Sequence, residues 1–198
     1  MEKQRLEAFT DGVIAIIITI MVLELKVPGS GSLGALSSGI PVYLAYALSF
    51  TNVAIFWNNH HHMLHATERV NGAVLWANMF LLFWMSLVPF AIRWMDETHF
   101  ASAPTALYGL VLALTAIGYV LLERCIIACN GPQSRLARAV GEDTKGKISL
   151  LMYVAAMPLA FVRPWIAIVL YVVVAGMWLV PDRRIEEMSE AGRGTPSR

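Results

Sequence analysis

The chain has 198 residues, of which 57% are hydrophobic and only 15% are charged. This composition is typical of an integral membrane protein and excludes a soluble globular domain as the main body of the chain. The formal net charge of +1 says little about partners, and no nucleic-acid partner is expected.

The first apolar stretch, residues 8–25, carries carboxylates unusually close to its centre. Its uncharged run from Gly12 to Leu23 spans about 18 Å as a helix, which is short of the ~30 Å hydrocarbon core. Asp11 or Glu24 must therefore lie at or near membrane depth, where a carboxylate is costly unless it faces protein or water. We expect an inner helix, beside a pathway or packed against polar partners. Glu24 and Lys26 are predicted to form an interfacial pair or an outer vestibule.

One face of this predicted helix is lined by branched aliphatic side chains. At 100° per residue, Ile16, Ile20 and Leu23 share a face and Thr19 lies at its edge. Asp11 points about 140° away, toward neighbouring helices. The face is either a pore lining or an ordinary packing and lipid-contact surface. The short apolar run and Asp11 favour the pore.

The second and third apolar stretches, residues 40–59 and 73–92, supply polar partners for Asp11. A polar group buried in a bilayer must be paired, which predicts a network joining Asp11 and Thr10 to an imidazole and an indole N–H. For Trp57 and Trp76, a place in an interfacial aromatic belt is an equal alternative. The predicted network residues on these two stretches or directly after them are Trp57, Asn59, His60, His61, Asn78 and Ser86.

Consecutive histidines, His60 to His62, and then His65 follow the second stretch. His61 and His65 share a helical face at a spacing that can chelate, yet Glu68 is the only acidic or cysteine side chain nearby in the sequence. A structural or proton-sensing role is therefore favoured over a metal site. The chain has no nucleophile elbow, zinc-protease motif or P-loop, so no enzyme is predicted.

Three more apolar stretches follow, at residues 104–122, 148–162 and 165–180. The last two are short and form either one bent span or a hairpin broken at Arg163-Pro164. Basic residues precede them in the 123–147 connection and follow them in the tail, so both flanks should be cytoplasmic and a hairpin is favoured. Pro164 suits the first turn of the last helix.

The stretches together predict an all-α integral membrane fold with six transmembrane helices. They form one domain over residues 1–181, followed by a short cytoplasmic tail over residues 182–198. Only Lys26, Arg93 and Arg163 lie in the first, third and fifth connections, whereas all other Lys and Arg residues lie in the N-terminus, the remaining connections and the tail. This asymmetry predicts cytoplasmic N- and C-termini.

Residues Arg5-x-x-x-Phe9-Thr10-Asp11 resemble the Arg-x-x-x-Phe-Ser-Asp signature of the transmembrane protein 175 potassium channels of endolysosomes and their prokaryotic relatives. Thr10 keeps the hydroxyl of the usual serine. The resemblance covers about the first ninety residues. Further matches are Asn59-His60-His61-x-x-Leu64, Asn78 with Leu81-Leu82-Phe83, and Ser86-Leu87-Val88-Pro89-Phe90.

The resemblance implies a prokaryotic single-repeat member, a multi-pass protein of the cell membrane that assembles as a homotetramer. It implies that the first helices line the pore, that Ile16 forms the constriction, that Ile20 and Leu23 form the next rings, and that Thr19 aids potassium preference. Arg5 falls on the same face of a straight helix. Expected partners are further copies of the chain, the lipid bilayer and monovalent cations. Potassium is the permeant species and no cofactor is expected.

We therefore interpret the chain as a potassium-permeable cation channel with a hydrophobic gate. One alternative is a secondary transporter or proton-coupled carrier that uses Asp11 and His60 as a relay. A second alternative is a structural or assembly protein with no conduction pathway.

Overall fold

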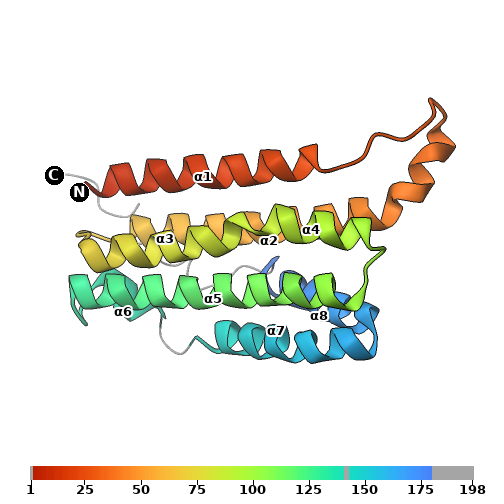
Figure 1. The fold of residues 1–198 in the computed structure, drawn as a ribbon. Coiled ribbons are helices and arrows are strands. Elements are labelled where there is room, and N and C mark those ends of the chain that lie inside the picture. The colour runs from red at the N-terminus through yellow and green to blue at the C-terminus, as the bar shows by residue number, and fades with distance from the viewer. Residues whose placement is uncertain (1, 141–142, 180–198) are drawn as a thin grey trace.

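The computed structural model describes residues 2–140 and 143–179, and this part of the chain is all α-helical (Figure 1). The predicted tail, residues 182–198, lies outside the described residues. The helices are α1 (Lys3–Leu23), the 3₁₀ helix η1 (Leu33–Gly39), α2 (Ile40–His65), α3 (Gly72–Ser86), α4 (Val88–Glu97), α5 (Ser102–Asn130), α6 (Arg135–Val140), α7 (Thr144–Val162) and α8 (Pro164–Leu179).

The long helices lie side by side in a bundle (Figure 1). Helix α1 occupies one edge, α7 and α8 occupy the opposite edge, and α5 lies between them in contact with α3, α4, α7 and α8. The backbones of α3 and α5 approach closely at Gly118, where an added Cβ would lie 2.9 Å from the Cα atom of Leu81. The apolar core is therefore centred on α5, and α1 is joined to it through α2, α3 and α4.

The third apolar stretch was expected as a single helix, but it is divided into α3 and α4 at Leu87. Pro89 causes this break, because it has no N–H to donate to the carbonyl of Met85 and its ring clashes with that carbonyl in a continuous helix. Pro89 instead lies in the first turn of α4, where its N–H is not needed. The break places Ser86 and Phe90 beside α1.

The last two apolar stretches form a hairpin of two packed helices, α7 and α8. Arg163 is the residue between them, with an extended backbone, and Pro164 begins α8. At 16 residues, α8 is about 24 Å long. Within the described residues, five helical segments are long and apolar enough to cross a membrane, and α8 is a shorter apolar helix. The fold is that of a multi-pass membrane protein, and the sixth crossing stays a prediction.

Candidate pore face and its polar network

Helix α1 packs against the bundle with one face and leaves the opposite face open. Ile17 and Met21 are 3% and 1% exposed on the packed face. Ile16, Ile20 and Leu23 are 57%, 41% and 79% exposed on the open face. The stripe predicted from helical periodicity is therefore a continuous aliphatic surface of the single chain, which we call the aliphatic stripe.

Thr19 also lies on the open side of α1. Its hydroxyl donates a hydrogen bond to the Ile16 carbonyl, at an oxygen-to-oxygen distance of 2.9 Å. This bond to the preceding turn occupies the hydroxyl proton and leaves the oxygen lone pairs available on the exposed face. Thr19 can thus present a polar oxygen beside the aliphatic stripe.

Two hydrogen-bonded units anchor the N-terminal half of α1 to α2 and α3. The Trp57 indole N–H donates to an Asp11 carboxylate oxygen at 2.8 Å. The Asn78 side-chain amide donates to the Thr10 hydroxyl at 2.9 Å, and its carbonyl oxygen lies 2.8 Å from Nε2 of His60. The imidazole therefore reaches α1 through Asn78 rather than through Asp11.

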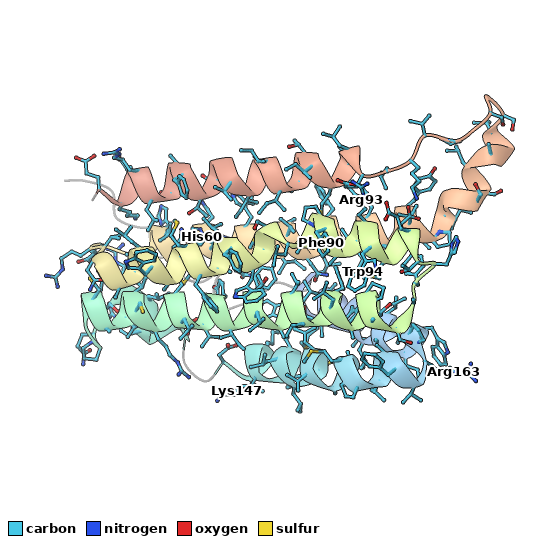
Figure 2. The ribbon with its side chains drawn as sticks, viewed as in Figure 1. His60, Phe90, Arg93, Trp94, Lys147 and Arg163 are labelled. Atoms are coloured by element: carbon cyan, nitrogen blue, oxygen red, sulfur yellow. The ribbon has the colours of Figure 1, made fainter. Side chains whose placement is uncertain are left out.

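The unit formed by Thr10, Asn78 and His60 is buried, and its hydrogen bonds require one particular protonation state of the His60 ring. Since the Asn78 oxygen can only accept, Nε2 of His60 carries the proton and donates. Thr10, His60 and Asn78 are at most 1% exposed, so water does not reach their polar atoms. Figure 2 shows His60 within the bundle, toward the end that holds the N-terminus. These bonds fix the depth and rotation of α1.

Other predicted network residues are placed differently. Asn59 and Ser86 donate to carbonyls of their own helices, those of Ile55 and Phe83. His61 lies 3.4 Å from a Glu7 carboxylate oxygen and stacks on Trp57, with 5.9 Å between ring centroids.

The signature motif is divided between the two faces of α1. Thr10 and Asp11 point into the polar units, whereas Arg5 and Phe9 are exposed. Trp76, which is 78% exposed, lies on the outside of the bundle. Within the described residues, no group of three or more His, Cys, Asp or Glu side chains is arranged to hold a metal ion.

Glu24 and Lys26 were expected to form an interfacial pair or an outer vestibule, and the first alternative is wrong because they do not pair with each other. Glu24 pairs with Arg93 at 3.2 Å, and Lys26 pairs with Asp96 at 3.0 Å, both on α4. The pairing depends on how far α4 reaches beside the end of α1, which the sequence spacing does not encode. In the sequence, Arg93 contributed only to the distribution of basic residues that predicts the orientation of the chain in the membrane.

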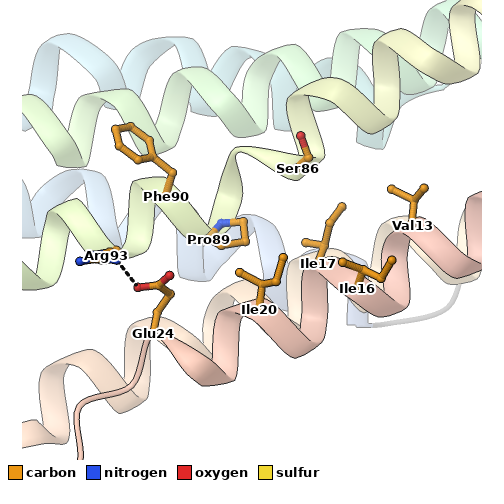
Figure 3. Close-up of a pocket in the computed structure, with 9 residues that line it drawn as sticks. All are labelled: Val13, Ile16, Ile17, Ile20, Glu24, Ser86, Pro89, Phe90 and Arg93. Atoms are coloured by element: carbon orange, nitrogen blue, oxygen red, sulfur yellow. Dashed lines mark ion pairs between the residues drawn. The ribbon is translucent and has the colours of Figure 1, made fainter.

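A groove lies along α1 beside the aliphatic stripe (Figure 3). It has a volume of about 510 Å³ and runs between α1 and the broken α3–α4 segment. Its α1 side is formed by Val13, Ile16, Ile17, Ile20 and Glu24, and its other side by Ser86, Pro89, Phe90 and Arg93.

The fold and this site define a multi-pass membrane protein whose first helix is anchored by polar bonds on one side and carries an open aliphatic face on the other. Residues 5–89 match the family model described as the endosomal/lysosomal potassium channel TMEM175. A protein of Chryseobacterium sp. (strain P1-3) named as a potassium channel is 51% identical over 187 residues, covering 94% of this chain and 97% of the relative. The chain therefore belongs to the TMEM175 family.

Two further comparisons agree with this assignment. A protein of Chamaesiphon minutus named as a potassium channel is 31% identical over 179 residues, covering 84% of this chain and 88% of the relative. The crystal structure of a lysosomal potassium-selective channel TMEM175 homolog from Chamaesiphon minutus superposes with a TM-score of 0.77 at 28% identity, covering 90% of this chain and 97% of that one. These proteins are channels, so the chain is grouped with channels and not with enzymes.

Proposed function

We propose that the chain is a potassium-permeable cation channel in which four copies assemble with α1 around a central pore. The observation that carries this proposal is the aliphatic stripe, which is exposed on α1 while Ile17, 100° round the helix, is buried on the packed face. Two relatives that are named as potassium channels support the choice of ion.

The position of α1 within one subunit is consistent with this assembly. Helix α1 was expected to be an inner helix, but it lies at the edge of the bundle (Figure 1). A helix at the edge of a subunit becomes an inner helix when copies assemble around an axis on that side. Closed rings of identical subunits are the usual form of homo-oligomers. The tetramer would bring four aliphatic stripes together on the axis.

The proposed gate is the ring of four Ile16 side chains. A ring of branched hydrocarbon excludes water, and an ion that crosses it loses hydration that the ring cannot replace. A small widening wets the ring and lets ions pass. Ile20 and Leu23 would form further rings, and Thr19 would offer the nearest side-chain oxygen. Selectivity should be modest, because aliphatic side chains supply no coordinating oxygens.

We place the channel in a prokaryotic cell membrane, with six crossings and a cytoplasmic N-terminus. The distribution of Lys and Arg over the connections supports this orientation. With the N-terminus cytoplasmic, the polar units of α1 lie toward the cytoplasm, and the ion pairs of Glu24 and Lys26 lie toward the outside.

The geometry favours the channel over a carrier that relays protons between Asp11 and His60. Asp11 accepts from Trp57, whereas His60 is bonded to Asn78, so the two groups have separate partners. Both therefore serve to hold α1 in place. Current at many ions per second without a proton gradient would distinguish the channel from the carrier.

Single-channel recording of Ile16→Asn in planar bilayers, under a potassium–sodium gradient, tests the gate. The amide should wet the ring, raise the single-channel current and weaken potassium preference. Ile17→Asn is the matched control: it lies 100° round the helix and is 3% exposed, so it should lower tetramer yield instead. If substitutions at Ile16, Ile20 and Leu23 all leave current and reversal potential unchanged, the hydrophobic gate is wrong for this chain.

A further inference from the structure

The end of α1 farther from the N-terminus is tied to α4 by charged side chains. The Arg93 guanidinium lies between two carboxylates: Glu24, which caps α1, at 3.2 Å, and Glu97, one turn along α4, at 3.1 Å. A second ion pair joins Lys26 to Asp96 at 3.0 Å. Figure 2 shows Arg93 close to the end of α1, at a distance along the bundle from His60.

Between this end and the polar units, α1 is held without directional bonds. Within the described residues, Gly12–Leu23 makes no hydrogen bond or ion pair to another helix, and its contacts are apolar ones such as those of Ile17 and Met21. The groove separates this stretch from α4 along the side that carries Ile16 and Ile20 (Figure 3). About 20 Å of helix separates Asp11 from Glu24. Apolar contacts allow small sliding and tilting that hydrogen bonds and ion pairs resist.

We propose that Arg93 is a positioning residue for the pore: its ion pair with Glu24 fixes the lateral position of the outer half of α1 and so the spacing of the Ile20 and Leu23 rings. This inference rests on the proposed function, because it assigns the stripe to the pore. Helix α1 is then fixed at two points, by Thr10 and Asp11 at one end and by Glu24 at the other. The groove between them gives the helix room to tilt toward α4 or away from it.

The exposure of the pair indicates that its role is geometric rather than a large contribution to folding. The side chains of Glu24 and Arg93 are 25% and 57% exposed, and partly exposed ion pairs contribute little to stability. Loss of the pair should change the equilibrium constant between positions of α1 tilted toward α4 and positions tilted away from it. The expected change is a factor of about 1.5 to 5 in each subunit. The folded tetramer should persist while its conduction changes.

The test compares Arg93→Gln with Glu24→Gln in planar bilayers, with single-channel current, open probability and reversal potential as readouts. These variants change the charge of the outer mouth in opposite directions. A purely electrostatic effect on cation entry would therefore move the current in opposite directions. A positioning effect moves conduction and selectivity in the same direction for both variants, because each breaks the same contact.

Two further variants complete the test. The exchange Glu24→Arg with Arg93→Glu keeps the net charge and restores a pair, so it should return the readouts toward wild type. The matched control is Glu97→Gln, which removes the partner of Arg93 on its own helix and leaves the contact with α1. It should leave conduction within experimental error of wild type.

Several outcomes would overturn the inference: opposite shifts in the two single variants, a failure of the exchange to restore conduction, or an effect of Glu97→Gln as large as that of Glu24→Gln. If a variant yields no tetramer, the exchange decides, because it must recover both assembly and conduction. A positive Ile16→Asn result with wild-type behaviour of all Glu24 and Arg93 variants would reject the inference and retain the proposed function. Absence of current from the wild-type tetramer would reject both.

Discussion

Replacement of Asn78 by leucine should destabilise the protein by about 2–3 kcal/mol. The substitution roughly keeps the buried volume but removes the bonds to Thr10, at 2.9 Å, and to His60, at 2.8 Å. Each buried polar group left without a partner costs about 1–3 kcal/mol. Thr10 can turn its hydroxyl to a carbonyl of its own helix, as threonines in helices commonly do. Nε2 of His60 is buried and has no such alternative, so most of the cost falls there.

The measurement is the midpoint temperature at which the detergent-solubilised protein loses its assembled form, monitored by size-exclusion chromatography after heating. A loss of 2–3 kcal/mol corresponds to a midpoint lower by about 4–12 °C for a chain of this size. Asn59→Leu is the matched control, because among the residues that the structure describes the Asn59 side-chain amide bonds only to the Ile55 carbonyl of its own helix. A shift for Asn78→Leu no larger than that for Asn59→Leu would refute the reasoning that this bridge holds α1.

Two other substitutions test separate features of the fold. Asp11→Ala removes the acceptor of the Trp57 indole N–H. The yield of assembled protein in detergent should therefore fall, while the conductance of each assembled channel stays unchanged. Normal yield with altered ion selectivity would instead place Asp11 in the conduction pathway. Gly118→Val should destabilise by about 1–3 kcal/mol in thermal unfolding, because its Cβ meets the α3 backbone. Gly12→Ala, where a Cβ meets nothing within 4 Å, is the control and should leave the stability of the single chain intact.

Much of the fold follows from local patterns in the sequence. Apolar runs separated by more polar connections predict the membrane-crossing helices, since each run must satisfy its own backbone hydrogen bonds in lipid. The basic residues on both flanks of the last two apolar stretches predict a hairpin broken at Arg163-Pro164, and the structure contains this hairpin as α7 and α8. Helical periodicity separates Ile16, which is exposed, from Ile17, which is buried. These features depend on residues within a few turns of one another.

The partners of the polar side chains were decided by the tertiary structure. Composition and spacing indicated that Asp11 needs a donor, but for both Trp57 and Trp76 a place in the polar network and a place in an interfacial belt were equal alternatives. Only the rotation of α2 against α1 brings the Trp57 indole to the carboxylate, whereas Trp76 points out of the bundle. A hydrogen bond requires its two heavy atoms to lie within a narrow range of distance and angle. The rotation of one helix against another determines whether the two atoms meet this requirement.

The same distinction holds at the other end of α1. The short apolar run alone indicates that Glu24 and Lys26 lie at the end of the first helix and that charges there need a partner or water. The tertiary structure decided that their partners are Arg93 and Asp96, because the break at Leu87 sets the direction of α4 and brings its charged face beside α1. Local periodicity fixes which way a side chain points on its own helix, whereas contacts between helices depend on depth and rotation that arise only when the bundle packs.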